Sequence, residues 1–172
     1  MAPALLVIDM LRDFVQAGGA LYIGPTAEEV KPRVAAHVAA ARREGRPVIY
    51  ACDRHRPDDA EFRMFPAHCL EGTPGAEVVP ELAPAAGDII IPKRRYSGFF
   101  GTDLDLTLRE EGVDELWLCG VCTNICVLYT AADARMRGYR VVVLQDAVAS
   151  FAEAAHRFAL EEMEKTLGCL VR

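Results

Sequence analysis

The sequence predicts an α/β fold, a doubly wound and mostly parallel sheet of about six strands with helices on both faces. Short apolar runs alternate with longer segments of helical periodicity along the whole chain, as in folds built from strand–helix–strand units. The apolar runs lack the polar alternation of a half-exposed strand, which indicates strands buried on both faces. Because the chain has 172 residues, 52% of them hydrophobic, and no break in composition, we expect a single domain over residues 1–172.

The first part of the chain is expected to supply two strands and one long helix. Residues 4–8 and residues 47–52 are continuous apolar runs, which predict the strands. Between them apolar residues recur at helical spacing, with Thr26 as the expected N-cap and Gly45 as the expected stop. Residues 56–84 contain many prolines and glycines, so we expect a long loop that lies over a functional site.

The second part continues the alternation. Further strands are expected at residues 88–91, 115–119, 140–144 and 169–171. Further helices are expected at residues 103–110, 128–137 and 151–167. Thr102 is the expected cap of the first of these helices, and Gly138 is expected to end the second.

The charge balance argues against two classes of partner. The chain carries 19 basic and 25 acidic residues, a net charge of −6, which disfavours nucleic acid or an anionic membrane. No apolar run approaches the roughly 20 residues that a bilayer-spanning helix needs. Residues 1–10 lack the pattern of a signal peptide, so we expect the six cysteines to be reduced thiols in the cytoplasm.

Reactive side chains follow four of the predicted strands at the point where each strand ends. Asp9 follows the first strand, and Asp53 and His55 follow the second. Lys93 follows the third, and the segment that leads to Cys126 follows the fourth. Because parallel strands present their carboxyl ends at one edge of the sheet, we expect these groups to share a site. The chain has neither a Gly-x-Ser-x-Gly motif nor a Rossmann glycine fingerprint, so a serine hydrolase and a dinucleotide-binding protein are not indicated.

Cys126 is the candidate nucleophile of this site. A thiol at the start of a helix has its thiolate stabilised and its pKa lowered, and the N–H groups there can receive an oxyanion. Asp9 could accept the thiol proton, and the charge of Lys93 could hold the ionised forms of both partners. Each residue also has a plain structural interpretation: a small buried hydrophobe for Cys126, a turn residue for Asp9 and a solvated loop residue for Lys93.

A metal site is the second candidate feature. Asp53 and His55 are two residues apart at a strand end, so their side chains point the same way, and His68 could fold back from the following loop. Two histidines and a carboxylate suit zinc, iron or manganese. The alternative is that both histidines only hydrogen-bond loop backbone. His37 and His156 lie within predicted helices, far from these strand ends, and are interpreted as structural or surface residues.

In its motifs, the chain resembles the isochorismatase-like cysteine hydrolases, and among them the bacterial nicotinamidases (pyrazinamidases). The matching segments are residues 7–14, 19–22, 53–55, 65–69, 72–75, 96–99, 101–104 and 120–127, together with Lys93. Each segment is only modestly specific, but their number and order make the resemblance specific, and it extends over essentially the whole chain.

The resemblance implies a catalytic triad of Asp9, Lys93 and Cys126. It implies that the backbone N–H groups of Cys122 and Cys126 form the oxyanion hole, with a cis peptide bond before Cys122. In this arrangement, the Cys122 thiol itself would take no part in the reaction.

The resemblance also implies how a substrate is held. Asp53, His55 and His68 would bind a divalent metal, most simply zinc, whose open face meets the ring nitrogen of a pyridine amide. Phe14, Phe65 and Tyr96 would contact the substrate ring.

The implied activity is that of a nicotinamidase, which hydrolyses nicotinamide to nicotinate and ammonia through a cysteine thioester in NAD salvage. Relatives of this kind are commonly oligomeric, so a homo-oligomer is expected. Two departures from the pattern leave the identity of the substrate undecided. Asn124 stands where nicotinamidases often carry aspartate, and Arg54 stands where many relatives carry an uncharged residue. The enzyme alternative is a metal-free amidohydrolase acting on a carbamoyl, ureido or maleamate compound. A redox or binding protein is a weaker alternative, because Cys122 and Cys126 lack the Cys-x-x-Cys spacing.

Overall fold

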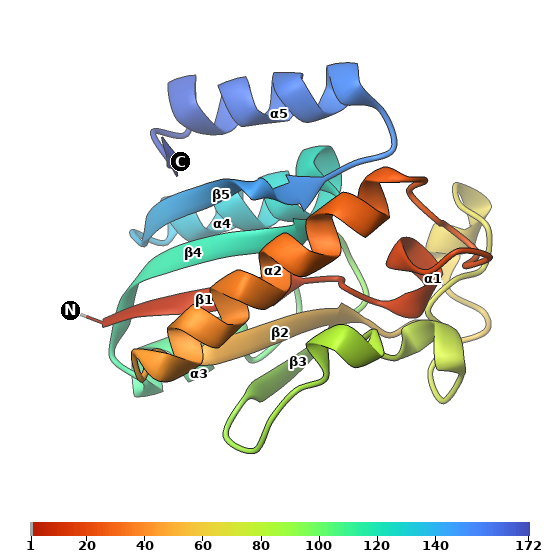
Figure 1. Cartoon of the computed structure of the whole chain (residues 1–172), viewed down its shortest axis with the longest axis horizontal. Coiled ribbons are helices and arrows are strands. Elements are labelled where there is room, and N and C mark those ends of the chain that lie inside the picture. The colour runs from red at the N-terminus through yellow and green to blue at the C-terminus, as the bar shows by residue number, and fades with distance from the viewer. Residues whose placement is uncertain (1) are drawn as a thin grey trace.

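The structure, a computed structural model, describes residues 2–172 and contains one six-stranded parallel sheet (Figure 1). The strands are β1 (Ala2–Ile8), β2 (Val48–Asp53), β3 (Ile89–Lys93), β4 (Val113–Val121), β5 (Arg140–Ala149) and β6 (Leu170–Val171). Their order in the sheet is β3-β2-β1-β4-β5-β6, so the chain winds outward from β1 in both directions. The predicted fold class is therefore confirmed.

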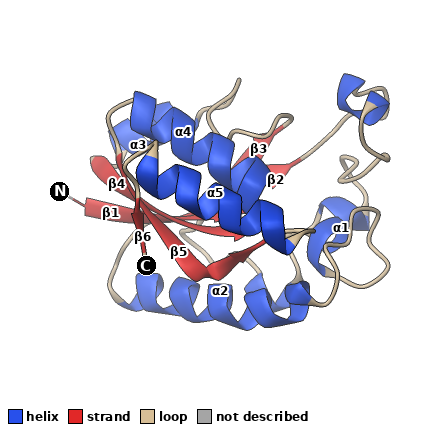
Figure 2. Cartoon of the chain, turned by 90° about the horizontal axis from the view of Figure 1, so that it is seen from above, coloured by secondary structure: helices blue, strands red, loops and turns tan. Residues whose placement is uncertain are grey.

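Helices cover both faces of the sheet (Figure 2). They are α1 (Arg12–Val15), α2 (Thr26–Arg43), α3 (Leu104–Glu110), α4 (Leu128–Met136) and α5 (Glu153–Lys165). The long helix α2 lies on one face, and α3, α4 and α5 lie on the other. The short helix α1 lies beyond the carboxyl ends of the strands, where the loops gather.

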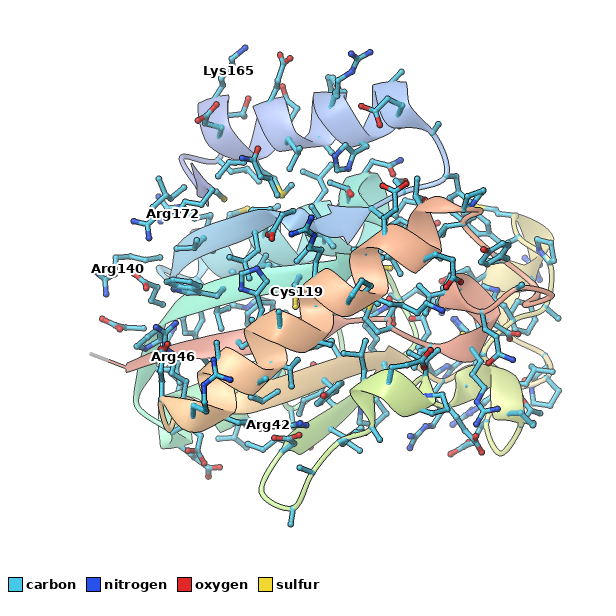
Figure 3. The ribbon with its side chains drawn as sticks, in the orientation of Figure 1. Arg42, Arg46, Cys119, Arg140, Lys165 and Arg172 are labelled. Atoms are coloured by element: carbon cyan, nitrogen blue, oxygen red, sulfur yellow. The ribbon has the colours of Figure 1, made fainter. Side chains whose placement is uncertain are left out.

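Neighbouring residues of the central strands pack against different helical layers. In β1, Leu5 and Val7 belong to the apolar cluster that includes α2, whereas Leu6 and Ile8 belong to the cluster that includes α3, α4 and α5. Because both faces of β1 are covered, every position in it can be apolar, which explains the unbroken hydrophobic runs of the sequence. Cys119 of β4 lies under α2 (Figure 3), and its thiol is 3.7 Å from the Leu6 carbonyl oxygen, so it is a core residue.

Three local expectations need correction. The N-cap of α2 is Pro25, and Thr26 is the first helical residue, with its hydroxyl 3.5 Å from the Ile23 carbonyl oxygen. Strand β5 continues five residues beyond the predicted end at 144, because its pairing with β4 resumes at Val148 after an irregularity. Cys126 lies in a π-helical turn, η4 (Thr123–Val127), and not in the first turn of α4.

The long loop at residues 56–84 has short helical turns of its own. They are η1 (Ala60–Arg63), η2 (Pro74–Ala76) and η3 (Pro80–Leu82). In the part of the chain that the structure describes, none of the helices combines the length and the apolar character needed to cross a membrane.

Gly120 lets β4 approach β1 closely beside the site. Its φ of 110° favours glycine, and a Cβ at this position would lie 2.0 Å from the carbonyl oxygen of Ile8. We expect Gly120→Ala to lower the free energy of unfolding in urea by about 3 kcal/mol, since the backbone of β1 would have to move. Gly87→Ala is the matched control, because Gly87 has a φ of 96° in open space; it should cost about 1 kcal/mol. Equal losses of unfolding free energy in the two variants would contradict a role for the close approach of Gly120 to Ile8.

Candidate active site and metal site

The carboxyl ends of four adjacent strands deliver the reactive side chains to one place. Asp9 follows β1, Asp53 ends β2 and Lys93 ends β3, while Cys126 lies in η4 directly after β4. Because β1 lies between β2 and β4, these ends are neighbours in space. Asp9 has a φ of 51°, a backbone conformation that residues other than glycine adopt rarely and that is often found at functional sites.

Cys126, Asp9 and Lys93 are in contact distance of one another. The Lys93 ammonium lies 2.8 Å from the Asp9 carboxylate and 3.5 Å from the Cys126 sulfur. Carboxylate oxygens of Asp9 and Asp53 lie within 4.8 Å of that sulfur and of each other. Asp9 and Lys93 are each only 1% exposed and Cys126 6%, so the group is almost closed to bulk water. The sulfur thus faces an acid and an ammonium, although Cys126 also packs in the apolar cluster that includes α3, α4 and α5.

The protonation of the three groups differs from the expectation in one respect. Burial raises the pKa of the Cys126 thiol well above its usual value, although the charge of Lys93 acts in the opposite direction. The expectation of a lowered pKa is therefore wrong, because desolvation outweighs the local positive charge. Burial and the nearby charge of Asp53 raise the pKa of Asp9 to about 6, against the influence of Lys93. Cys126 thus rests as a thiol beside a carboxylate that can accept a proton near neutral pH.

The predicted metal ligands converge, and a fourth residue joins them. The candidate metal cluster consists of Asp53, His55, Glu61 and His68, whose ligand atoms all lie within 4.8 Å of one another. His55 Nε2 is 3.4 Å from Asp53 Oδ2 and 3.9 Å from Glu61 Oε1. His68 Nε2 is 3.7 Å from the same Asp53 oxygen and 3.9 Å from the same Glu61 oxygen. All four side chains are buried.

The orientation of both imidazole rings fits a metal. Nδ1 of His55 is 3.1 Å from an Asp59 oxygen, and Nδ1 of His68 is 2.7 Å from the carbonyl oxygen of Pro66. Both oxygens only accept, so each Nδ1 carries a hydrogen and each Nε2 faces the cluster, where the neutral ring would offer its lone pair to a metal. Nε2 of His55 is buried and has no hydrogen-bond partner among the described residues, as expected of a ligand atom. Two imidazoles and two carboxylates suit zinc, iron or manganese.

Glu61 was missed by the sequence reasoning. It lies within η1, inside the proline-rich loop, where neither strand ends nor helical periodicity mark a functional position. Only the folding of this loop places the carboxylate of Glu61 close to that of Asp53. Three acidic residues, at 58, 59 and 61, lie between the histidines at 55 and 68, so that spacing does not single out Glu61.

The three predicted substrate-contacting aromatic residues surround one pocket beside the nucleophile. The aromatic pocket is lined by Phe14, Phe65 and Tyr96 together with Cys122, Cys126, Asp53, Glu61 and His68. The ring centroids of Phe65 and Tyr96 are 6.3 Å apart, and those of Phe14 and His68 are 5.5 Å apart. Leu21, Ile125 and Phe151 complete the lining and were not predicted.

Several other expectations concern the segment around Cys126. The peptide bond between Val121 and Cys122 is cis, as predicted. His156 is not remote from the site, because its Nδ1 lies 2.8 Å from the hydroxyl of Thr123 in η4. Asn124 accepts a hydrogen bond from the Ser150 hydroxyl.

Asn124 and Arg54, the two departures that leave the identity of the substrate undecided, do not border the aromatic pocket. The described residues that line the pocket include neither Asn124 nor Arg54. Arg54 lines a separate groove with Arg56, Arg94 and Arg95. The two departures therefore do not change the walls of the aromatic pocket.

Comparison with known proteins identifies the family. The family model described as "Isochorismatase domain" matches residues 3–171. The nicotinamidase/pyrazinamidase PncA from Bacillus subtilis is 40% identical with a TM-score of 0.95, covering 99% of both chains. A pyrazinamidase from Pyrococcus horikoshii in complex with zinc is 37% identical with a TM-score of 0.94, covering 100% of this chain and 99% of the other.

The similarity extends to a relative with another substrate. The N-carbamoylsarcosine amidase from Thermoplasma acidophilum is 40% identical with a TM-score of 0.92, covering 100% of this chain and 96% of the other. Identity alone therefore does not separate amide substrates within this group. The fold, the family match over nearly the whole length and these relatives together show that this chain belongs to the isochorismatase family of hydrolases.

Proposed function

We propose that this protein is a nicotinamidase, which hydrolyses nicotinamide to nicotinate and ammonia and so returns the pyridine ring to NAD synthesis. One observation supports this most strongly: the pocket beside Cys126 is lined by aromatic side chains and by three members of the candidate metal cluster, Asp53, Glu61 and His68. The chemistry of this lining matches a flat heteroaromatic amide, with aromatic side chains for its ring and a thiol for its amide carbon. The enzyme would act as one hydrolase domain in the cytoplasm, as a homo-oligomer.

In the first half of the proposed reaction, Cys126 acts as the nucleophile and Asp9 as the base. The thiol proton moves to the Asp9 carboxylate as the sulfur attacks the amide carbon. The N–H groups of Cys122 and Cys126 stabilise the negative charge that forms on the amide oxygen. Asp9 then gives its proton to the amide nitrogen, the C–N bond breaks, and ammonia leaves a thioester behind.

In the second half, water replaces ammonia. Asp9 accepts one proton from the water while the water oxygen attacks the thioester carbon, and the C–S bond breaks to release nicotinic acid, which loses its remaining proton to solvent and becomes nicotinate. The proton returns from Asp9 to the Cys126 sulfur. Lys93 remains protonated throughout, because the charges of Asp53 and Asp9 hold its pKa well above the usual value against the effect of burial. Its charge favours the thiolate during attack.

The candidate metal cluster would hold the substrate ring. Asp53, His55, Glu61 and His68 would bind a divalent metal, with zinc as the first choice, and the metal would supply a Lewis-acidic position for a ring nitrogen. Phe14, Phe65 and Tyr96 would fix the plane of the ring. The amide carbon would then lie at the sulfur of Cys126.

The competing function is that of a related amidohydrolase for a carbamoyl, ureido or maleamate compound. The similarity to an N-carbamoylsarcosine amidase supports it. Those substrates have no ring nitrogen, so a metal held by the two histidines and two carboxylates could not orient them in the way proposed for nicotinamide. The cluster therefore favours the pyridine amide.

The decisive experiment measures ammonia release from nicotinamide, pyrazinamide, N-carbamoylsarcosine, maleamate and ureidoacrylate, before and after removal of metal by a chelator. We expect kcat/KM for one of the two ring amides to exceed all others by at least about tenfold. Chelation should remove that activity, and added zinc or manganese should restore it. Preference for a substrate without a ring, with no effect of chelation, would overturn the proposal.

A further inference from the structure

We propose that Asp59 is a positioning residue that fixes two of the candidate metal ligands and joins them to the strand end carrying Lys93. The inference rests on the proposed metal site, but it does not depend on which amide is hydrolysed. Asp59 lies in the loop after β2 and is 4% exposed. Nothing in the catalytic cycle described above uses it.

The first two contacts of Asp59 reach the ligands themselves. One carboxylate oxygen, Oδ2, lies 3.1 Å from Nδ1 of His55. The other, Oδ1, accepts a hydrogen bond of 3.0 Å from the backbone N–H of Glu61 and so caps the turn η1. A single carboxylate thereby sets the ring orientation and tautomer of His55 and the start of the turn that carries Glu61.

The other two contacts reach the segment that follows Lys93. Nε of Arg94 lies 3.0 Å from Oδ2, and Nη1 of Arg95 lies 3.0 Å from Oδ1. The carbonyl oxygen of Arg95 in turn accepts a hydrogen bond of 3.1 Å from the Lys93 ammonium. Asp59 therefore connects the loop that supplies two ligands with the backbone that holds the lysine.

Burial of the Asp59 carboxylate costs free energy, and a purely structural role does not explain that cost. A buried carboxylate needs several donors to remain charged, and here four donors from two separate segments converge on one residue. Without the Asp59 carboxylate, the His55 ring is free to rotate or to change tautomer. Loss of a hydrogen-bond partner of a metal ligand typically weakens metal binding by about 10- to 100-fold.

The test is the affinity of the metal-free protein for zinc, measured by competition with a chromophoric chelator. We expect Asp59→Ala to weaken zinc binding about 10- to 100-fold, and Asp59→Asn to weaken it as well, because the amide lacks the charge that holds His55 and both arginines. Asp58→Asn is the matched control: it removes an equal charge from an adjacent, exposed residue and should bind zinc as the wild type does. The absorption spectrum of the cobalt form should change in the Asp59 variants only.

Thermal unfolding of the metal-free proteins separates positioning from folding. If Asp59→Ala does not fold, Asp59→Asn, which keeps the size of the side chain, decides the matter. A folded Asp59 variant with wild-type zinc affinity and an unchanged cobalt spectrum would overturn the inference, and so would a wild type that binds no metal. A wild type whose zinc affinity depends on Asp59 but that prefers another amide would leave the inference standing and refute the nicotinamidase proposal alone.

Discussion

Replacing Cys126 with alanine is expected to abolish amide hydrolysis, with a loss of about 10⁴-fold or more in kcat. The reason is that the proposed route has no other group to form the acyl intermediate. Asp9 and Lys93 would remain, but a carboxylate and an ammonium alone do not supply the covalent step. The measurement is ammonia release under saturating nicotinamide, together with mass spectrometry of enzyme quenched during turnover.

The mass of the quenched wild-type enzyme should include an acyl adduct, and that of the Cys126→Ala variant should not. Cys169→Ala is the matched control, since Cys169 is also a buried thiol but does not line the aromatic pocket. It should keep near wild-type activity. Full ammonia release by Cys126→Ala, or an adduct on another residue, would show that the nucleophile is assigned wrongly.

Replacing Lys93 with methionine is expected to damage both stability and activity. The ammonium lies 2.8 Å from the Asp9 carboxylate and 2.5 Å from that of Asp53, and Lys93 is 1% exposed. Without it, two buried carboxylates lose their shared positive partner. Loss of one partner of a buried ion pair typically costs about 3–5 kcal/mol, and we expect a decrease of that order in the free energy of unfolding.

A double-mutant cycle tests the physical reason. Asp53→Asn removes one of the two carboxylate charges, so the double variant Lys93→Met/Asp53→Asn should be more stable than Lys93→Met alone. Urea unfolding of the four proteins measures this coupling, and ammonia release should remain low in every variant. If the two effects on stability simply add, the charges do not interact, and the electrostatic account of the site fails.

The fold could be predicted from the sequence because its signals are local. Residues 4–8 are apolar at every position, which requires a strand covered on both faces, and α2 shows its buried face through regular spacing. The end of β5 was missed since the exposed polar residues Gln145 and Asp146 interrupt the apolar run, although pairing with β4 continues beyond them.

The candidate site was predicted in part from strand ends and in part from the family resemblance, which supplied the aromatic residues of the pocket. Asp9, Asp53 and Lys93 were found from strand ends, because a parallel sheet gathers such positions at one edge. Glu61 and Asp59 follow His55 by only six and four residues, but they belong to a loop without periodicity, so the way this loop packs decides their approach to His55. No local pattern of the sequence marks that packing.

The sequence alone fixed the kinds of reactive group and the elements that carry them, since apolar spacing and strand ends are properties of neighbouring residues. Distances and solvation were decided by the tertiary structure. Helix position by itself suggested an acidic thiol at Cys126, but burial among packed elements raises its pKa and leaves proton acceptance to Asp9. Desolvation depends on everything that surrounds a group, and residues far apart in the chain supply most of those surroundings.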